Sequence, residues 1–244
     1  MAAVAAQSLS NPKIKLTLAD VLRFHVIMTR YLFVILTLCA FPSWAQGTIA
    51  SAGRIEQATG GGTCSAVLVQ PDVIATAAHC NTDSKLVFRL GDGVESEPFE
   101  IVELIAHPLY EQTKDRVDWK LRFDIAVGRL AKPVPVDLAR PYTIGDEAKA
   151  GERLFIVSWR SDGSDRPRQR ACPVFNGIPG LVTLGCRVQG GESGAPVLRK
   201  TKDGLELVAI ISSRTRRLEQ PVAQASDVRL RLPPLFDLVE ATSP

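Results

Sequence analysis

Short apolar runs rich in Val, Ile and Leu recur along the chain from about residue 64 onward, and this pattern constrains the fold more than any other feature. Their lengths suit β-strands, and clusters of Gly, Pro, Asp and Ser separate them at roughly the spacing typical of a sandwich or barrel. Only the stretch LPPLFDLVEA near the end favours a helix. The sequence therefore predicts an all-β fold built from the runs CSAVLV, VIATAA, KLVFRL, FEIVELIA, DIAVGRL, RLFIVSW, LVTLGC, APVLRK and LELVAIISS.

Length and composition agree with one sizeable β domain or two small ones. The 244 residues are 45% hydrophobic, which can furnish a packed core and excludes a disordered chain. A formal charge of +3, from 29 basic and 26 acidic residues, is too balanced to predict a nucleic-acid partner. The Pro-rich segment 131–141 is the best candidate for a connection between two β halves, which we expect to be joined near residues 131–150.

Residues 28–45 have the layout of a secretory signal peptide. After a short basic start, an apolar run covers residues 31–41, and the small residues Ser43 and Ala45 suit cleavage before Gln46. The apolar run is about half of the roughly 20 residues that a permanent membrane helix needs. We therefore expect an exported protein, secreted or periplasmic, without a stable membrane anchor.

The signal-like layout also predicts how the rest of the chain is divided. If Met28 is the true start, residues 1–27 are a long leader or a mis-annotated extension. Residues 46–244 are then the mature domain.

The cysteine count supports export. Cys64, Cys80, Cys172 and Cys186 remain after the signal segment, an even number in a chain bound for an oxidising compartment. Nearness in sequence favours the pairs Cys64–Cys80 and Cys172–Cys186, each closing a loop of about 15 residues worth roughly 3 kcal/mol in the chain-entropy model. A metal site is the alternative interpretation, but the sequence has no C-x-x-C pair and no clustered His, so we expect no metal.

Three separate stretches together supply the groups that a nucleophilic serine needs. His79 ends an apolar run, Asp124 opens the run DIAVGRL, and Ser193 lies within RVQGGESGAPVL. Such a serine requires a base to take its proton, and the base requires an acceptor that fixes its tautomer. His79 or Asp124 alone would more often be structural, and the Ser193 segment alone fits an ordinary β-turn equally well. Their occurrence together, in the order His, Asp, Ser, is what indicates catalysis.

In these stretches the chain resembles the trypsin-like (chymotrypsin-fold) serine peptidases. TAAHC matches the family's histidine motif, DIAVGRL is similar to its DIALLRL motif, and GGESGAP is similar to GDSGGP around the nucleophile, over a span of about residues 60–241. The resemblance implies two six-stranded antiparallel β-barrels packed with the active site between them, and a short C-terminal helix. It also implies that His79, Asp124 and Ser193 are catalytic, that the substrate is a protein or peptide, and that no cofactor is needed.

The resemblance assigns supporting residues as well. Glycines around Ser193 permit a loop that aims backbone N–H groups at a developing oxyanion, and the implied donors are the amides of Gly191 and Ser193. Ser212 follows Ser193 by 19 residues, where the family places a serine that supports the aspartate and lines the substrate cleft.

Some positions depart from the family pattern. Glu192 stands where the family usually has Asp, the residue that receives a freed N-terminal amine in zymogen-type members. No IVGG-like junction occurs, and RIEQ at Arg54 lies too close to Cys64 to leave room for the usual first strand, so we do not expect activation by that salt bridge. Cys186 stands seven residues before Ser193, an arrangement more like that of bacterial secreted members.

Two functions follow from these observations. The first is a secreted serine endopeptidase, expected to be a monomer, that hydrolyses peptide bonds through an acyl-enzyme intermediate. The alternative is a catalytically silent peptide-binding module on the same fold. Substrate preference stays open, because Arg187 and Arg214 are placed either to favour an acidic or polar side chain or to be solvated surface charges.

Overall fold

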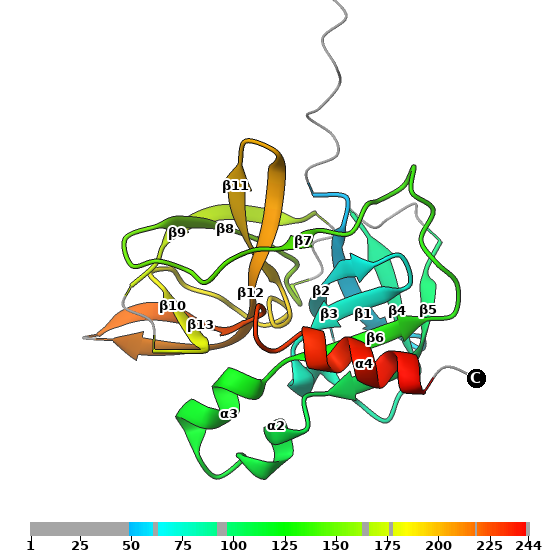
Figure 1. Cartoon of the computed structure of the whole chain (residues 1–244), viewed down its shortest axis with the longest axis horizontal. Helices are drawn as coiled ribbons and strands as arrows, with labels where there is room; N and C mark the ends of the chain where they lie inside the picture. Colours follow the sequence, from blue (N-terminus) through cyan, green and yellow to red (C-terminus); the bar gives the residue numbers. More distant parts are fainter. Residues whose placement is uncertain are drawn as a thin grey trace, which may run out of the picture. The chain divides into compact units, whose positions relative to one another are not determined.

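The computed structural model describes residues 49–60, 63–91, 97–162, 166–175, 178–217 and 219–242. The expected leader (1–27) and signal peptide (28–45) lie outside the described residues. No helix within these described ranges has the length and apolar character needed to cross a membrane. The elements, shown in Figure 1, are β1 (Ala52–Gln57), β2 (Thr63–Gln70), β3 (Val73–Thr76), η1 (Ala78–Cys80), β4 (Leu86–Leu90), β5 (Phe99–Ala106), α2 (Leu109–Gln112), α3 (Val117–Phe123), β6 (Ala126–Leu130), β7 (Thr143–Ile144), β8 (Arg153–Ser158), β9 (Arg168–Pro173), β10 (Leu181–Leu184), β11 (Pro196–Thr201), β12 (Gly204–Arg217), β13 (Gln220–Asp227) and α4 (Pro233–Ala241).

The first half of the described chain is a closed barrel with the strand order β1-β2-β3-β6-β5-β4. All of its strand pairs are antiparallel. Strand β4 shows why the apolar runs form strands here, since Leu86, Phe88 and Leu90 are buried while the residues between them are partly exposed. Such alternation is expected of a strand with one face on a core, because successive side chains point to opposite faces.

The second half is a curled sheet with the order β10-β13-β12-β11-β8-β9, and β7 pairs with β12 in parallel. An isolated bridge between Val174, just after β9, and Leu184, at the end of β10, brings the two edges together. These features confirm the predicted fold class. One closed six-stranded barrel and a short C-terminal helix are as expected, and a curled half-barrel takes the place of the second closed barrel.

One hydrophobic cluster belongs to both halves. It includes Val127 of the barrel, Trp159 after β8, and Leu235 and Val239 of α4. Figure 1 shows α4 in red, lying against β5 and β6. The last helix therefore covers the core on which the barrel and the sheet meet.

RIEQ lies within the first strand itself, because β1 begins at Ala52 and pairs with β2 so that Ile55 lies opposite Cys64. One expectation from the sequence is wrong. The apolar runs predicted a helix only near the C-terminus, whereas α2 and α3 lie between β5 and β6. Burial of Tyr110 and Phe123 in a small cluster stabilises these helices, which are too short to show a helical pattern in the sequence.

Candidate active site

His79 lies in the short helix η1, directly after β3. The disulfide between Cys64 and Cys80 ties this turn back to β2. The His79 side chain is 37% exposed, so the ring is accessible from solvent on one side while its Nδ1 contacts Asp124.

Asp124 lies between α3 and β6 and is only 4% exposed. One carboxylate oxygen accepts the His79 backbone N–H (3.0 Å), and the other lies 2.8 Å from His79 Nδ1 and accepts the Ser212 hydroxyl. Burial disfavours the charged carboxylate, but the hydrogen bonds and charge of His79 and the bond from Ser212 outweigh burial and hold the pKa of Asp124 below its ordinary value of 3.8. An ionised acceptor at Nδ1 keeps the proton on that nitrogen, which leaves Nε2 able to act as a base.

A serine that sequence reasoning did not single out fixes the turn that carries Asp124. The hydroxyl of Ser226, on β13, donates to the backbone carbonyls of Leu121 (2.7 Å) and Asp124 (3.2 Å). Ser212 on β12 and Ser226 on β13 thus hold this segment of the barrel half from the second sheet. The sequence offers no signal for Ser226, since a serine in a strand is ordinary.

The loop around Ser193 is packed against the strands that lead to His79. Gly191 and Gly194 have φ of 86° and 78°, values that side chains rarely tolerate. A Cβ at Gly194 would overlap the Ser65 carbonyl oxygen and the Thr76 hydroxyl. The Ser65 N–H also donates to the Ser193 carbonyl (2.7 Å). The glycines are therefore required by the close approach between this loop and the barrel.

The four consecutive amides of this loop alternate in their hydrogen bonding. Glu192 N–H donates to the Gln189 carbonyl (3.2 Å), and Gly194 N–H donates to the carbonyl of Ile211, the neighbour of Ser212 (2.7 Å). Within the residues that the structure describes, the N–H groups of Gly191 and Ser193 have no acceptor. Two neighbouring donors are thus available to an oxygen of a bound molecule, as an oxyanion hole requires.

The structure does not join every predicted residue by a hydrogen bond. His79, Asp124 and Ser212 form a continuous hydrogen-bonded chain. The loop that carries Ser193 is hydrogen-bonded to Ser65 of the barrel and to Ile211 of the second sheet. Among the described contacts, the Ser193 hydroxyl makes no hydrogen bond to the His79 ring. Such bonds are often long in an unliganded site and tighten when substrate binds.

Glu192, next to Ser193, is fully buried and held by a partner that sequence reasoning missed. Arg170 on β9 donates to both carboxylate oxygens of Glu192 (2.8 and 3.0 Å). The Ser158 hydroxyl and the backbone N–H of Gln189 also donate to this carboxylate (2.7 Å each). Burial disfavours ionisation of Glu192, but the bonds and charge of Arg170 and the bond from Ser158 outweigh it and lower the pKa. The sequence could show only that a buried acid would need a cation, not which arginine supplies it.

Both expected disulfides are present, Cys64–Cys80 and Cys172–Cys186. Cys64, His79 and Cys80 place potential metal ligands within 4.8 Å of one another. Their sulfur atoms are bonded to each other, however, so neither is a free thiolate, the form in which cysteine binds metals.

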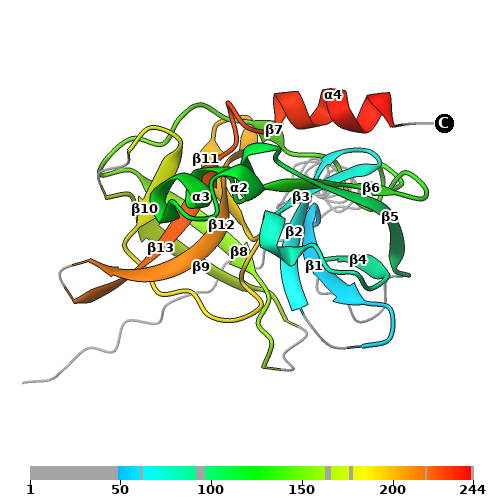
Figure 2. The same cartoon turned by 90° about the horizontal axis from the view of Figure 1, so that it is seen from below.

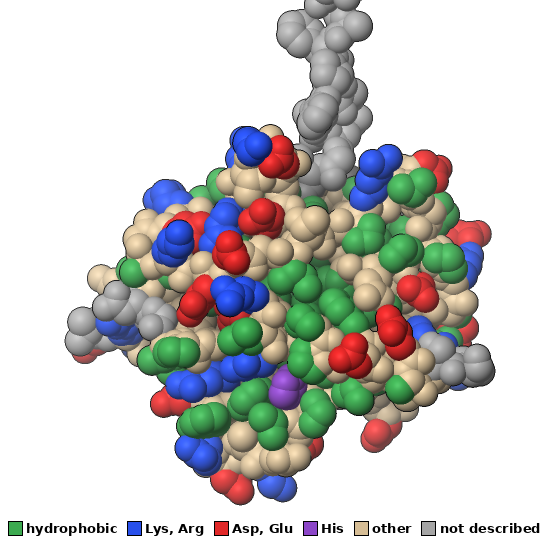
Figure 3. Space-filling view, viewed as in Figure 1, with side chains coloured by type: hydrophobic (Ala, Val, Ile, Leu, Met, Phe, Trp, Pro, Cys, Tyr) green, Lys and Arg blue, Asp and Glu red, His purple; other side chains and the backbone are tan. Residues whose placement is uncertain are grey.

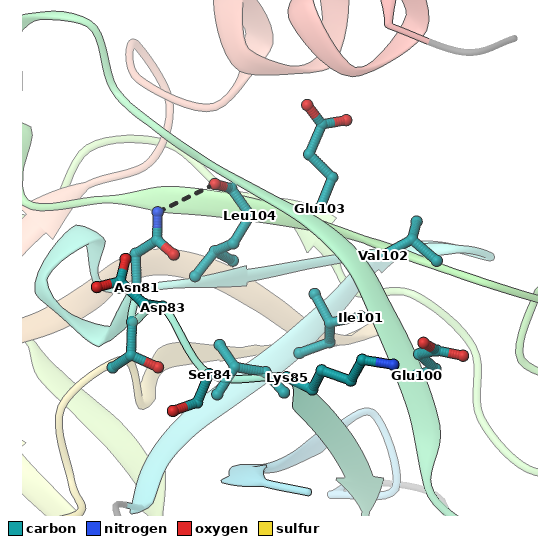
Figure 4. A pocket seen from close by; sticks show the side chains of 11 residues that line it. Asn81, Asp83, Ser84, Lys85, Glu100, Ile101, Val102, Glu103 and Leu104 are labelled. Carbon is teal, nitrogen blue, oxygen red and sulfur yellow. Dashed lines mark hydrogen bonds between the residues drawn. The ribbon is translucent and has the colours of Figure 1, made fainter.

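The structure has two hollows lined by segments that continue from these residues in the sequence. One, of about 370 Å³, is formed by the segment after Cys80 and by β5 (Figure 4), where the Asn81 side-chain amide donates to the Leu104 carbonyl (3.3 Å). Its rim carries Lys85 together with Glu100 and other acids. The other, of about 610 Å³, is lined by arginines and lies next to Ser212 in the sequence of β12.

Comparison with known proteins agrees with this geometry. The model of the Trypsin family matches residues 43–176, more than half of the chain, including His79 and Asp124 and ending before Ser193. A search of curated proteins found no match. From the family match, the two-part β fold and the sequence motifs together, the chain belongs to the Trypsin family of chymotrypsin-fold serine peptidases.

Proposed function

We propose that this peptidase is an exported endopeptidase that cuts peptide bonds through an acyl-enzyme, with Ser193, His79 and Asp124 as its catalytic residues. The observation that carries the proposal is the hydrogen-bonded chain from Ser212 through Asp124 to His79, beside a glycine-rich loop with two unpaired amides. The two disulfides favour an oxidising compartment. In this proposal residues 28–45 are removed and the mature domain begins at Gln46.

The reaction assigns one role to each group. His79 Nε2 takes the proton of Ser193 as the serine oxygen bonds to the substrate's carbonyl carbon, and the carbonyl oxygen becomes an oxyanion bound by the Gly191 and Ser193 amides. His79 then gives the proton to the departing amine as the C–N bond breaks, which leaves Ser193 acylated. Water repeats the sequence, breaks the ester and restores the serine. Asp124 stays ionised and stabilises the imidazolium.

The test measures cleavage of a mixed peptide library by purified mature protein, alongside labelling by an organophosphonate, which reacts only with an activated serine. Ser193→Ala should abolish labelling and reduce cleavage by at least about a thousandfold, as is usual when a member of such a set is removed. The matched control is Ser84→Ala, a change at an exposed serine between Cys80 and β4. Circular dichroism confirms that both variants fold.

Equal cleavage by wild type and Ser193→Ala would remove Ser193 from the mechanism. Absence of both cleavage and labelling in the folded wild type would overturn the enzyme and favour the silent peptide-binding module. N-terminal sequencing of exported protein tests the start at Gln46, and recovery of a chain that retains residues 31–41 would contradict processing.

A further inference from the structure

The arginine-lined cavity of about 610 Å³ is formed by the segment after Cys186 and by the β12–β13 hairpin. Arg187 comes from the segment between Cys186 and the Ser193 loop. Arg214, Thr215 and Arg216 come from β12, and Pro221 and Val222 from β13, which pairs with it. Figure 2 shows the β12–β13 hairpin extending from the second sheet, away from the barrel.

Both walls of the cavity are close in sequence to residues of the candidate site. Arg214 lies two residues beyond Ser212, whose hydroxyl bonds Asp124. Arg187 lies in the segment that continues, through Gln189, into the loop with the unpaired Gly191 and Ser193 amides. The two segments that line the cavity are therefore continuations of the segments that carry Ser212 and the two unpaired amides.

The charge of the cavity is unbalanced. Arg187, Arg214 and Arg216 are exposed, and none of them forms an ion pair with a carboxylate among the residues that the structure describes. Arg214 and Arg216 are alternate residues of one strand, so their side chains project from the same face. Other arginines behave differently, since Arg170 and Arg199 are each paired with a glutamate at 3.0 Å or less.

This arrangement differs from the face seen in Figure 3 and from the hollow seen in Figure 4. On the face seen in Figure 3, basic and acidic side chains are interspersed. The hollow in Figure 4 likewise carries Lys85 beside Glu100 and Glu103. The arginine cavity has no acidic lining residue, and Pro221 and Val222 add an apolar wall against which methylene groups can pack.

We propose, on the basis of the proposed function, that this cavity binds the acidic side chain of a peptide substrate, so that the enzyme cuts after Glu or Asp. Guanidinium groups bind carboxylates by charge-assisted and often bidentate hydrogen bonds. The apolar wall accommodates the methylene groups of Glu. A cationic side chain is repelled by three positive charges, which excludes substrates with Lys or Arg at this position.

The experiment uses peptides that differ only in the residue before the cleaved bond, with Glu, Gln, Asp, Asn, Lys or Phe at that position. We expect kcat/KM for Glu over Gln, and for Asp over Asn, to be roughly tenfold to a hundredfold higher, as for a hydrogen bond to a charged group. The preference should weaken at high salt, because the arginines are exposed. Faster cleavage after Lys or Phe, or equal rates for Glu and Gln, would overturn the proposal.

Variants of the cavity arginines test whether the cavity causes the preference for an acidic residue. Arg187→Gln and Arg214→Gln should each lower kcat/KM for the Glu peptide by about tenfold or more and leave the Gln peptide nearly unchanged. Arg153→Gln, at an exposed arginine of β8 outside the cavity, is the matched control and should change neither. Unchanged Glu preference in both cavity variants would contradict the assignment.

Failure of this inference is distinguishable from failure of the proposed function. Phosphonate labelling of Ser193 together with cleavage that ignores acidic residues leaves the peptidase intact and overturns the acidic preference. Labelling with no cleavage of any peptide in the series also overturns that preference. Absence of both labelling and cleavage overturns the function and the inference together.

Discussion

At the scale of single residues, Glu192 shows how a buried charge is stabilised next to the Ser193 loop. Its carboxylate is fully buried, yet four donor groups surround it, two of them from Arg170. A buried carboxylate without such partners costs several kcal/mol. The position next to Ser193 means that this ion pair also fixes the loop conformation, since Glu192 is anchored to β8 and β9.

Arg170→Met should therefore destabilise the protein by about 3 kcal/mol, because it removes both guanidinium hydrogen bonds to the buried Glu192 and leaves only Arg160, 3.9 Å away, as a cation. Urea unfolding measures the change. Arg168→Met, at an exposed position two residues earlier on β9, is the matched control and should stay within about 0.5 kcal/mol of wild type. A loss at position 170 no greater than that at position 168 would show that the pair contributes nothing.

At the scale of elements, the two disulfides stabilise the fold by joining strands to neighbouring segments. The disulfide Cys172–Cys186 joins β9 to the segment after β10, and Cys64–Cys80 joins β2 to the turn that carries His79. Each closes a loop that the unfolded chain would otherwise explore freely.

Replacing either pair by alanines should lower the free energy of unfolding by about 3 kcal/mol. Because only Cys64–Cys80 holds the His79 turn, its loss should also slow phosphonate labelling of Ser193, whereas loss of the other pair should slow it less. Thermal unfolding and labelling rates measure the two effects. A greater effect on labelling from the Cys172–Cys186 variant would contradict the proposed role of the His79 turn.

The elements also show how far the sequence predicts this fold. Each of the nine apolar runs coincides with a strand. The Val, Ile and Leu residues of each run predict its alternating or continuous burial. Strands β9 and β13, with sequences RQRACP and QPVAQASD, carry no such run. They are formed by pairing with β8 and β12, which a reading of local sequence cannot reveal.

The candidate site also contains residues that the sequence predicts and residues that it does not. Motifs of adjacent residues predict His79, Asp124 and Ser193 as site residues, and the family resemblance predicts Ser212. Arg170 and Ser226 act through contacts between segments distant in sequence, and neither lies in a motif. Their roles depend on the register of the sheet, which the sequence does not show.

At the scale of the whole molecule, several carboxylates titrate differently in the folded and unfolded chain. The pKa of Glu192 lies below its ordinary value of 4.5, and that of Asp124 lies below 3.8. The folded state thus binds these protons less tightly than the unfolded state. Asp227 acts in the opposite sense, because burial raises its pKa.

The free energy of unfolding should therefore decrease as the pH falls below about 4.5, since the unfolded chain then takes up more protons than the folded one. Urea midpoints between pH 7 and pH 3 measure the dependence. Glu192→Gln should flatten it, and Asp237→Asn, at an exposed position on α4, should not. A midpoint that stays constant or rises toward pH 3 would contradict the expectation.

The shared core beneath α4 has a consequence for the order in which the protein is made. The cluster runs from Ala52 in the first strand to Val239 in the last helix. A ribosome delivers the strand first and the helix last, so the buried surface common to both halves cannot close until synthesis is almost complete. The core common to the two halves therefore closes only after α4 has been synthesised.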